Sequence, residues 1–217
     1  PAGGPAVHAA GPEGAGVKAN RTLLLGGGIM LLVLLAIVLG PMLSPYDAEA
    51  MDFIDVLTPP DASHWLGTDS YGQDVLTRVL AGGRISFLAS FGGVALGAAI
   101  GTVLGMVAAW RGGWREAGLM SACDLLFAFP SFVLALFMMV VLGFGLHNVV
   151  VAIGLTYLPI FARLSRNLTR SLMHEPFVQA ARLMGQRPAR ILAVEILPNI
   201  LSTLLVQASV GVAFGVV

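Results

Sequence analysis

The chain alternates between long apolar stretches and shorter polar ones. Uncharged runs occupy residues 22–43, 85–110, 125–162 and 200–217. A helix needs about 20 apolar residues to cross a bilayer, so the first two runs each fit one span. The third run fits two helices only if their ends extend past its charged neighbours. The pattern therefore predicts an all-α polytopic membrane protein with five visible transmembrane helices.

The N-terminal third of the chain falls into three parts. Residues 1–20 are rich in Pro, Gly and Ala and lack apolar periodicity, which predicts a disordered tail. Residues 21–43 are read either as a secretory signal or as an uncleaved first transmembrane helix. The length of the run and the lack of a small-x-small cleavage site favour the helix. Residues 44–84 form a polar loop, in which residues 70–80 are predicted to form a short surface helix.

Charge is sparse and unevenly distributed. Charged residues make up 11% of the chain, whereas soluble domains carry about 25%. Basic residues gather in the tail, in a charged turn at residues 111–116 and in the polar segment 163–198, while the loop 44–84 is acidic. Cytoplasmic loops carry an excess of Lys and Arg. The distribution predicts a cytoplasmic N-terminus and a cytoplasmic segment 163–198, and the zero net charge gives no reason to expect nucleic-acid binding.

Residues typical of catalysis or metal binding are few. The four histidines lie far apart and show no metal-ligand spacing, and the single cysteine excludes an intrachain disulfide. The only lysine, Lys18, is not part of a GxxxxGK[ST] phosphate loop. The sequence therefore predicts no catalytic residue and no metal site. If ATP drives this protein, another chain must bind it.

One predicted span carries a stripe of glycines. Residues four apart lie on one face of a helix, and small residues on such a face let another helix backbone approach closely. The stripe predicts a helix-packing surface, and the sequence leaves open whether it is a fixed contact or a seam that slides during transport. Its members are Gly93, Gly97, Gly101 and Gly105.

Two polar residues lie inside predicted spans. Asp124 falls within the third helix, where a carboxylate is by default a functional candidate. The alternative is a structural partner for an arginine near the cytoplasmic edge. Gln207 lies in the last apolar run and is predicted to face protein rather than lipid. Pro130 is predicted to kink the third helix.

The polar segment 163–198 is predicted to contain two short helices. The first is expected over residues 176–184, because proline suits a first helical turn and Gly185 suits a left-handed C-terminal cap. The second is expected over residues 189–196, ended by Leu197-Pro198. We interpret the segment as a docking element whose residues are Glu175, Pro176, Gln179, Ala180, Ala181, Arg182, Met184, Gly185, Leu197 and Pro198.

These residues resemble a known family. Gln179-Ala180-Ala181, Gly185 and Leu197-Pro198 match the spacing of the E-A-A-x-x-x-G and I-x-L-P motif of ABC-importer permeases, with Gln179 in place of Glu and Glu195 in place of Ile. Residues 64–74, 83–86, 111–114 and 124–130 are similar to the C-type permease of peptide and nickel importers. The resemblance covers residues 23–217, identifies 85–217 as the permease core, and implies a sixth helix beyond the five seen here.

The resemblance also implies a function. It implies a permease subunit of an ATP-driven importer that moves di- or oligopeptides across a prokaryotic plasma (inner) membrane by alternating access, with no catalytic residue of its own. The implied partners are a second permease in a heterodimer, two cytosolic ATPases that bind ATP and Mg, an external or periplasmic substrate-binding protein, and membrane lipid. A nickel or glutathione importer of the same type and an ATPase-independent secondary transporter stay open as alternatives, and a membrane enzyme ranks last.

Overall fold

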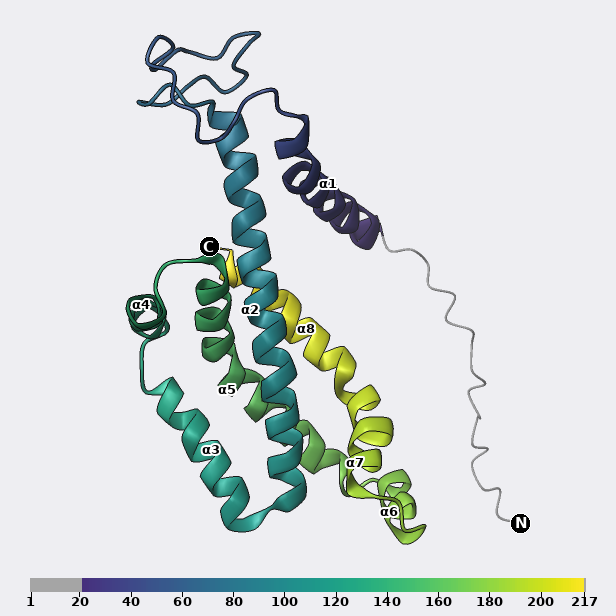
Figure 1. Cartoon of the computed structure of the whole chain (residues 1–217). Helices are drawn as coiled ribbons and strands as arrows, with labels where there is room; N and C mark the ends of the chain where they lie inside the picture. The colour runs from purple at the N-terminus through teal and green to yellow at the C-terminus, as the bar shows by residue number, and fades with distance from the viewer. Residues whose placement is uncertain (1–20, 217) are drawn as a thin grey trace, which may run out of the picture. The chain divides into compact units, whose positions relative to one another are not determined.

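The computed structural model describes residues 21–216, so the predicted disordered tail lies outside the described residues (Figure 1). The regular elements of the described part are helices, which confirms the predicted all-α class. They are α1 (Arg21–Leu43), α2 (Val75–Arg111), α3 (Gly113–Phe127), α4 (Ser131–Leu142), α5 (Leu146–Leu172), α6 (Pro176–Leu183), α7 (Pro188–Arg190), the π-helix η1 (Ile191–Ile196) and α8 (Leu197–Gly215). The chain divides into two compact units at Ala81 and Gly82.

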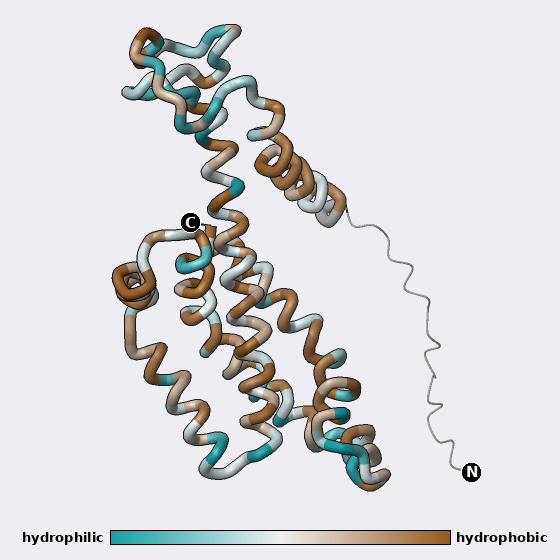
Figure 2. Tube along the Cα trace, viewed as in Figure 1, coloured by the Kyte–Doolittle hydropathy of each residue, from teal (hydrophilic) through white to brown (hydrophobic). Residues whose placement is uncertain are grey.

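The described residues hold four or five candidate spans, against the five predicted. Four helical runs are long and apolar enough to cross a membrane: Leu24–Leu43, Val75–Arg111, Leu146–Leu172 and Pro188–Gly215. Helices α3 and α4 meet the same criterion only together, and they are bent by 90° at a short break, as in a broken span or a re-entrant loop. Figure 2 shows the hydrophobic residues, in brown, along these helices. The polytopic membrane architecture predicted from the apolar runs is therefore confirmed.

The second span starts earlier than the apolar run indicates. Residues 70–74 form a turn, and α2 runs from Val75 to Arg111. The prediction of a separate surface helix over residues 70–80 is therefore wrong. Once a helix has a capped first turn, each further residue is added at little cost, so the polar residues before Ile85 continue the helix instead of interrupting it.

Pro130 breaks the third span instead of kinking it. Helix α3 ends at Phe127, and α4 starts at Ser131 with Pro130 as its N-cap, at φ −54° and ψ 134°. Proline lacks an N–H, and it disfavours the helical conformation of the residue before it. The helix therefore ends ahead of Pro130 and restarts after it in a new direction.

The last helical run passes through Leu197-Pro198, so the prediction that these residues end a helix is wrong. Helices α7, η1 and α8 form one run from Pro188 to Gly215, and the last span therefore also begins before Ile200. Proline cannot donate the usual hydrogen bond and clashes with the carbonyl four residues before it. The wider π-turn over Ile191–Ile196 includes the residue whose carbonyl would clash with Pro198 in a regular α-helix. The Asn199 side-chain amide donates to the Glu195 carbonyl at 2.6 Å, which gives that oxygen a partner.

The core of the second unit includes the short helix α6. Val178 of α6 is fully buried together with Phe161 of α5, Ile191 and Ile196 of η1 and Ile200 of α8. Each such side chain stabilises the fold by roughly 1.5–3 kcal/mol where the alternative is water. Helix α6 is therefore part of the helical core, not a detached loop.

Candidate functional site

Helix α6 has defined ends. Pro176 occupies its first turn, where the missing N–H costs nothing. At the other end Gly185 has φ 70°, and its N–H donates to the Arg182 carbonyl at 3.0 Å. The Gln186 N–H donates to the Ala181 carbonyl at 3.1 Å. These two bonds form a Schellman motif, so the predicted left-handed cap at Gly185 is confirmed.

The two faces of α6 differ. Val178 and Ala181 are 0% and 2% exposed and belong to the core that includes η1. On the other face Leu183 is 89% exposed, Met184 is 70% exposed, and Ala180 is exposed as well. Helix α6 therefore has one face in the core and one face open to its surroundings.

Gln179 has a role that a glutamate cannot fill. Its side-chain Nε2 donates a hydrogen bond to the His174 carbonyl at 2.9 Å, across the turn before α6. A carboxylate has no hydrogen to donate unless it is protonated. Gln179, which replaces the usual Glu, therefore adds a hydrogen bond between α6 and the turn that follows α5.

Arg182 connects α6 to the end of α2. Its guanidinium lies 4.3 Å from the centre of the Trp110 ring. A cation over an aromatic face stabilises such a contact by roughly 0.5–1 kcal/mol at exposed sites. Helix α6 is thus linked to η1 through its buried face and to α2 through this cation–π pair.

The glycine stripe lies directly against α5. A Cβ atom built on Gly97, Gly101 or Gly105 would lie 2.7, 2.4 or 2.1 Å from a backbone carbonyl oxygen of α5, and one on Gly93 would lie 2.5 Å from Ile153. No side chain fits at these distances, so the two helix backbones are in contact. The stripe joins α2 to the helix that leads into α6.

Ion pairs join α3 to α5. Glu116 is only 7% exposed and pairs with Arg166 and, at 3.4 Å, with Arg170. Asp124 pairs with Arg163, and the side chains of both are about half exposed. Asp124 therefore has the arginine partner that was the structural alternative for this carboxylate. The pairs follow the antiparallel course of the two helices visible in Figure 1.

Sequence reasoning assigned Glu116 to a turn and missed its pairs with α5, while an arginine partner for Asp124 was one of its two alternatives. Helix α3 begins at Gly113, so Glu116 is already helical. The spacing is compatible with these pairs but does not fix the register of the two helices. Arg163, Arg166 and Arg170 are three and four residues apart, and Glu116 and Asp124 are separated by about two turns.

Gln207 is half-buried on α8. Among the residues that the structure describes, no group of His, Cys, Asp or Glu side chains is arranged to hold a metal ion.

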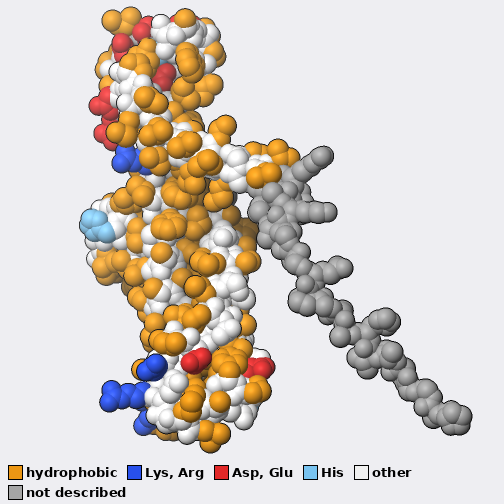
Figure 3. All heavy atoms as spheres, turned by 90° about the vertical axis from the view of Figure 1, so that its right-hand side faces the viewer, with side chains coloured by type: hydrophobic (Ala, Val, Ile, Leu, Met, Phe, Trp, Pro, Cys, Tyr) orange, Lys and Arg blue, Asp and Glu red, His pale blue; other side chains and the backbone are white. Residues whose placement is uncertain are grey.

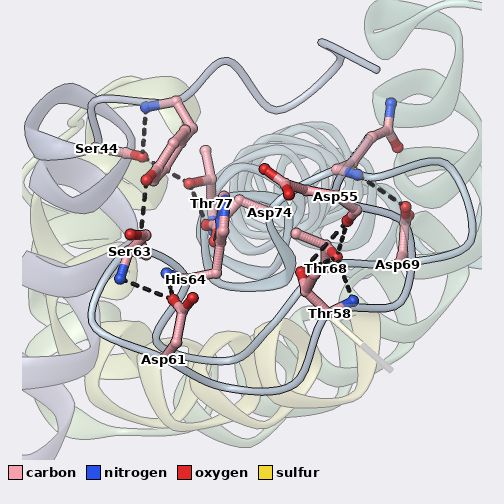
Figure 4. A network of polar contacts seen from close by, with 12 residues as sticks. Ser44, Asp55, Thr58, Asp61, Ser63, His64, Thr68, Asp69, Asp74 and Thr77 are labelled. Carbon is pink, nitrogen blue, oxygen red and sulfur yellow. Dashed lines mark hydrogen bonds and ion pairs between the residues drawn. The ribbon is translucent and has the colours of Figure 1, made fainter. Parts of the chain in front are cut away.

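The first unit contains a polar network at the start of α2 (Figure 4). Asp74 accepts hydrogen bonds from the Thr77 N–H at 2.8 Å and from its hydroxyl at 2.6 Å, and thereby caps α2. The other carboxylate oxygen lies 3.0 Å from His64 Nδ1, and Thr77 also bonds Ser44 at 2.6 Å. Burial alone raises the pKa of Asp74, but the bonds from Thr77 and His64 outweigh it and lower the pKa below its usual range.

This network explains a sequence motif. His64 and Asp74 stand at the two ends of the stretch that resembles importer permeases, and the fold brings their side chains together. Between them Gly72 has φ 71°, and a Cβ atom there would lie 1.6 Å from the Asp52 carbonyl oxygen. The residue types of the motif are therefore required to fold the loop and to start α2.

Comparison with known families gives two matches. The family "Binding-protein-dependent transport system inner membrane component" matches residues 101–216, which include the glycine stripe from Gly101 onward, the ion pairs and α6. The family "N-terminal TM domain of oligopeptide transport permease C" matches residues 17–60. The first describes a transport component, not an enzyme.

Individual relatives agree with these matches. The glutathione transport system permease protein GsiD of Salmonella typhimurium is 43% identical over 190 residues, which cover 87% of this chain and 63% of the relative. The GsiD proteins of Pectobacterium atrosepticum and Escherichia coli O6:H1 are 38% and 40% identical, over 91% and 82% of this chain and 66% and 59% of their own. The chain thus spans less than two thirds of the length of these curated relatives.

Proposed function

Because the chain belongs to the family of binding-protein-dependent transport system inner membrane components, we propose that it is the permease subunit of an ATP-driven importer. In this proposal a second permease completes the translocation pathway. Two cytosolic ATPases bind ATP and Mg and dock on the permeases. A binding protein delivers the substrate to the outer face. The chain itself contributes the membrane spans and the helix that transmits movement of the ATPases to them.

The observation that carries this proposal is the construction of α6. One face of the helix is buried in the core with η1, and the other presents Leu183 and Met184 to the outside. Pro176 starts the helix and the Schellman motif at Gly185 ends it, so the helix keeps its shape when its exposed face is loaded. A groove on an ATPase subunit would receive the exposed face, with Ala180 allowing close approach.

Movement of α6 would be transmitted to several spans together. Its buried face connects it to η1 and α8, and the turn at its start connects it to α5. Helix α5 is in turn in backbone contact with α2 through the glycine stripe and is paired with α3 through Glu116 and Asp124. Closure of the ATPases would then shift these helices between inward-open and outward-open arrangements, and the coupling free energy would act equally in both directions.

The relatives favour glutathione over longer peptides as the substrate. The three relatives compared above are glutathione transport permeases, and glutathione was an alternative to the di- or oligopeptides that the sequence resemblance put first. Both are small peptides with free carboxylates. We therefore place a glutathione-type short peptide first, with di- and oligopeptides second and nickel chelates third.

The orientation in the membrane follows from charge. In the second unit most of the arginines, in blue in Figure 3, gather at the end that carries α6. An excess of basic residues marks the cytoplasmic side. The charges thus support an orientation in which cytosolic ATPases can reach α6 and in which, with one span in α1 and one in α2, the N-terminus lies in the cytoplasm of a prokaryotic cell.

The test is reconstitution of the full-length chain with its partner permease, ATPases and binding protein in proteoliposomes. Labelled glutathione, a dipeptide, an octapeptide and a nickel chelate are supplied outside with ATP inside. We expect glutathione uptake that requires both ATP and the binding protein. Uptake by the permeases alone, driven by a proton gradient, would instead support the secondary-transporter alternative.

A further inference from the structure

The turn between α2 and α3 borders a groove that the proposed transport cycle does not use. Gly112 and Gly113 reverse the chain with φ values of 62° and 57°. Beside them lies a groove of about 440 Å³ between the end of α2 and the start of α3. Apolar residues from both helices, two arginines and a tryptophan line it. Among the lining residues are Val107, Arg111, Trp114, Arg115, Leu119 and Ala122.

The two arginines differ from those of α5. Arg163, Arg166 and Arg170 all pair with carboxylates of α3. Arg111 and Arg115 are exposed, and no carboxylate within the described part of the chain lies within ion-pairing distance of either. They therefore present two positive charges that this part of the protein does not neutralise.

Trp114 lines the groove together with these two arginines. It is 79% exposed, and the Arg115 guanidinium lies 5.5 Å from the centre of its ring. Exposed tryptophan is typical of the level at which a membrane meets water. The arrangement of an apolar groove, an interfacial ring and two guanidinium groups matches an amphiphile with an anionic head.

We propose that this groove binds an anionic phospholipid of the surrounding bilayer. The acyl chain lies against Val107, Leu119 and Ala122, and the phosphate lies between Arg111 and Arg115. Guanidinium groups bind phosphate with paired hydrogen bonds, and long basic side chains reach from apolar surface to the headgroup level. The inference rests on the proposed membrane function, because it needs α2 to span the bilayer.

A lipid fits these observations better than a protein partner. Helix α2 by itself is apolar and long enough to span a membrane, and α3 is so together with α4, so the proposal places the apolar walls of the groove against the hydrocarbon region. Basic groups between membrane helices on the cytoplasmic side are known to attract anionic headgroups. Such a lipid would hold the α2–α3 turn at the membrane surface while α6 moves.

Native mass spectrometry of the assembled full-length transporter tests the proposal. The detergent-solubilised complex is titrated with phosphatidylglycerol or with phosphatidylcholine of the same acyl chains. Each basic residue near an anionic headgroup contributes about fivefold in affinity, so two should favour phosphatidylglycerol by roughly 30-fold. We expect one such tight site per chain in the wild type, and the double variant R111Q/R115Q should lose that preference.

A matched double variant controls for charge alone. Arg187 and Arg190 are also exposed, and R187Q/R190Q removes the same charge outside the groove. This control should keep the tight phosphatidylglycerol site. Three results would each overturn the proposal. The first is an equal loss of bound lipid in both double variants, and the second is unchanged lipid binding in R111Q/R115Q. The third is equal binding of the two lipids by the wild type. Loss of the ATPases from R111Q/R115Q with lipid retained would assign the groove to a protein partner. None of these readouts depends on uptake.

Discussion

Gly185 offers the sharpest perturbation of the proposed coupling element. A Cβ atom there would meet no other atom within 4 Å, so substitution strains only the backbone, which has φ 70°. A residue with a Cβ pays about 1–2 kcal/mol in this left-handed region. The open state lacks the cap bonds in wild type and variant alike, so only the strain changes the balance between the two states. A strain of about 1–2 kcal/mol lowers the ratio of capped to open α6 roughly 5- to 30-fold.

The assay compares uptake with ATP hydrolysis in proteoliposomes of the assembled transporter. We expect Gly185→Val to reduce substrate uptake by about fivefold or more, by the lower end of that range, while basal ATPase activity persists. Gly185→Asn should stay close to the wild type, because asparagine tolerates the left-handed conformation. The ratio of uptake to hydrolysis thus reports whether the shape of the α6 end matters.

A control separates coupling from general instability. Gly143, at the turn before α5, has φ 84° and ψ 175°, and a Cβ there also meets open space. This conformation is almost restricted to glycine, so Gly143→Val is strained at least as much. It should lower thermal stability without changing the ratio of uptake to hydrolysis. Normal substrate-stimulated ATPase and uptake in Gly185→Val would refute the reasoning.

Three further predictions concern the frame around α6. Gly105→Ala places a Cβ atom 2.1 Å from the Ala162 carbonyl oxygen. It should lower the free energy of unfolding by about 1–3 kcal/mol, measured by thermal unfolding. Gly82→Ala, where the space is open, should leave the stability unchanged. Glu116→Gln leaves its arginines without a buried carboxylate and should cost about 1–2 kcal/mol, less than for a fully buried pair because the arginines are partly exposed. The depressed pKa of Asp74 stabilises the loop before α2 at pH values above its unfolded pKa of about 3.9, and this stabilisation is lost as the pH falls through the lower folded pKa. Fluorescence of Trp65, in protein whose other two tryptophans are phenylalanine, should show this acid transition, and Asp74→Asn should remove it.

Much of the architecture was predictable because apolar runs reflect the thickness of a bilayer. The runs gave the candidate spans, and proline and glycine gave α6 to within one residue at its end. These features depend on short-range rules: Pro176 starts a helix and Gly185 caps one. The motif from His64 to Asp74 was visible in the sequence, but the role of Asp74 as the cap of α2 could be seen only in the folded loop.

Two kinds of feature could not be predicted: how the backbone passes a proline, and which side chains pair between helices that are distant in sequence. Pro130 and Pro198 have the same chemistry, yet the first breaks a helix and the second lies within a continuous run. The difference at Pro198 is the preceding π-turn and the Asn199 amide, neither of which has a sequence signal of its own. The pairing of Glu116 with α5 likewise requires the register of two helices that are far apart in sequence.

The most direct measurement of the central claim is photo-cross-linking from α6 in the assembled transporter. A photoreactive residue replaces Leu183, which is 89% exposed on α6, or Phe144, which is 91% exposed at the turn before α5. Both are introduced into the full-length chain, purified with its own ATPase subunits. We predict a cross-link to an ATPase subunit from position 183 and none from position 144. Cross-linking to the ATPase from position 144 but not from position 183 would contradict the assignment of α6 as the docking element.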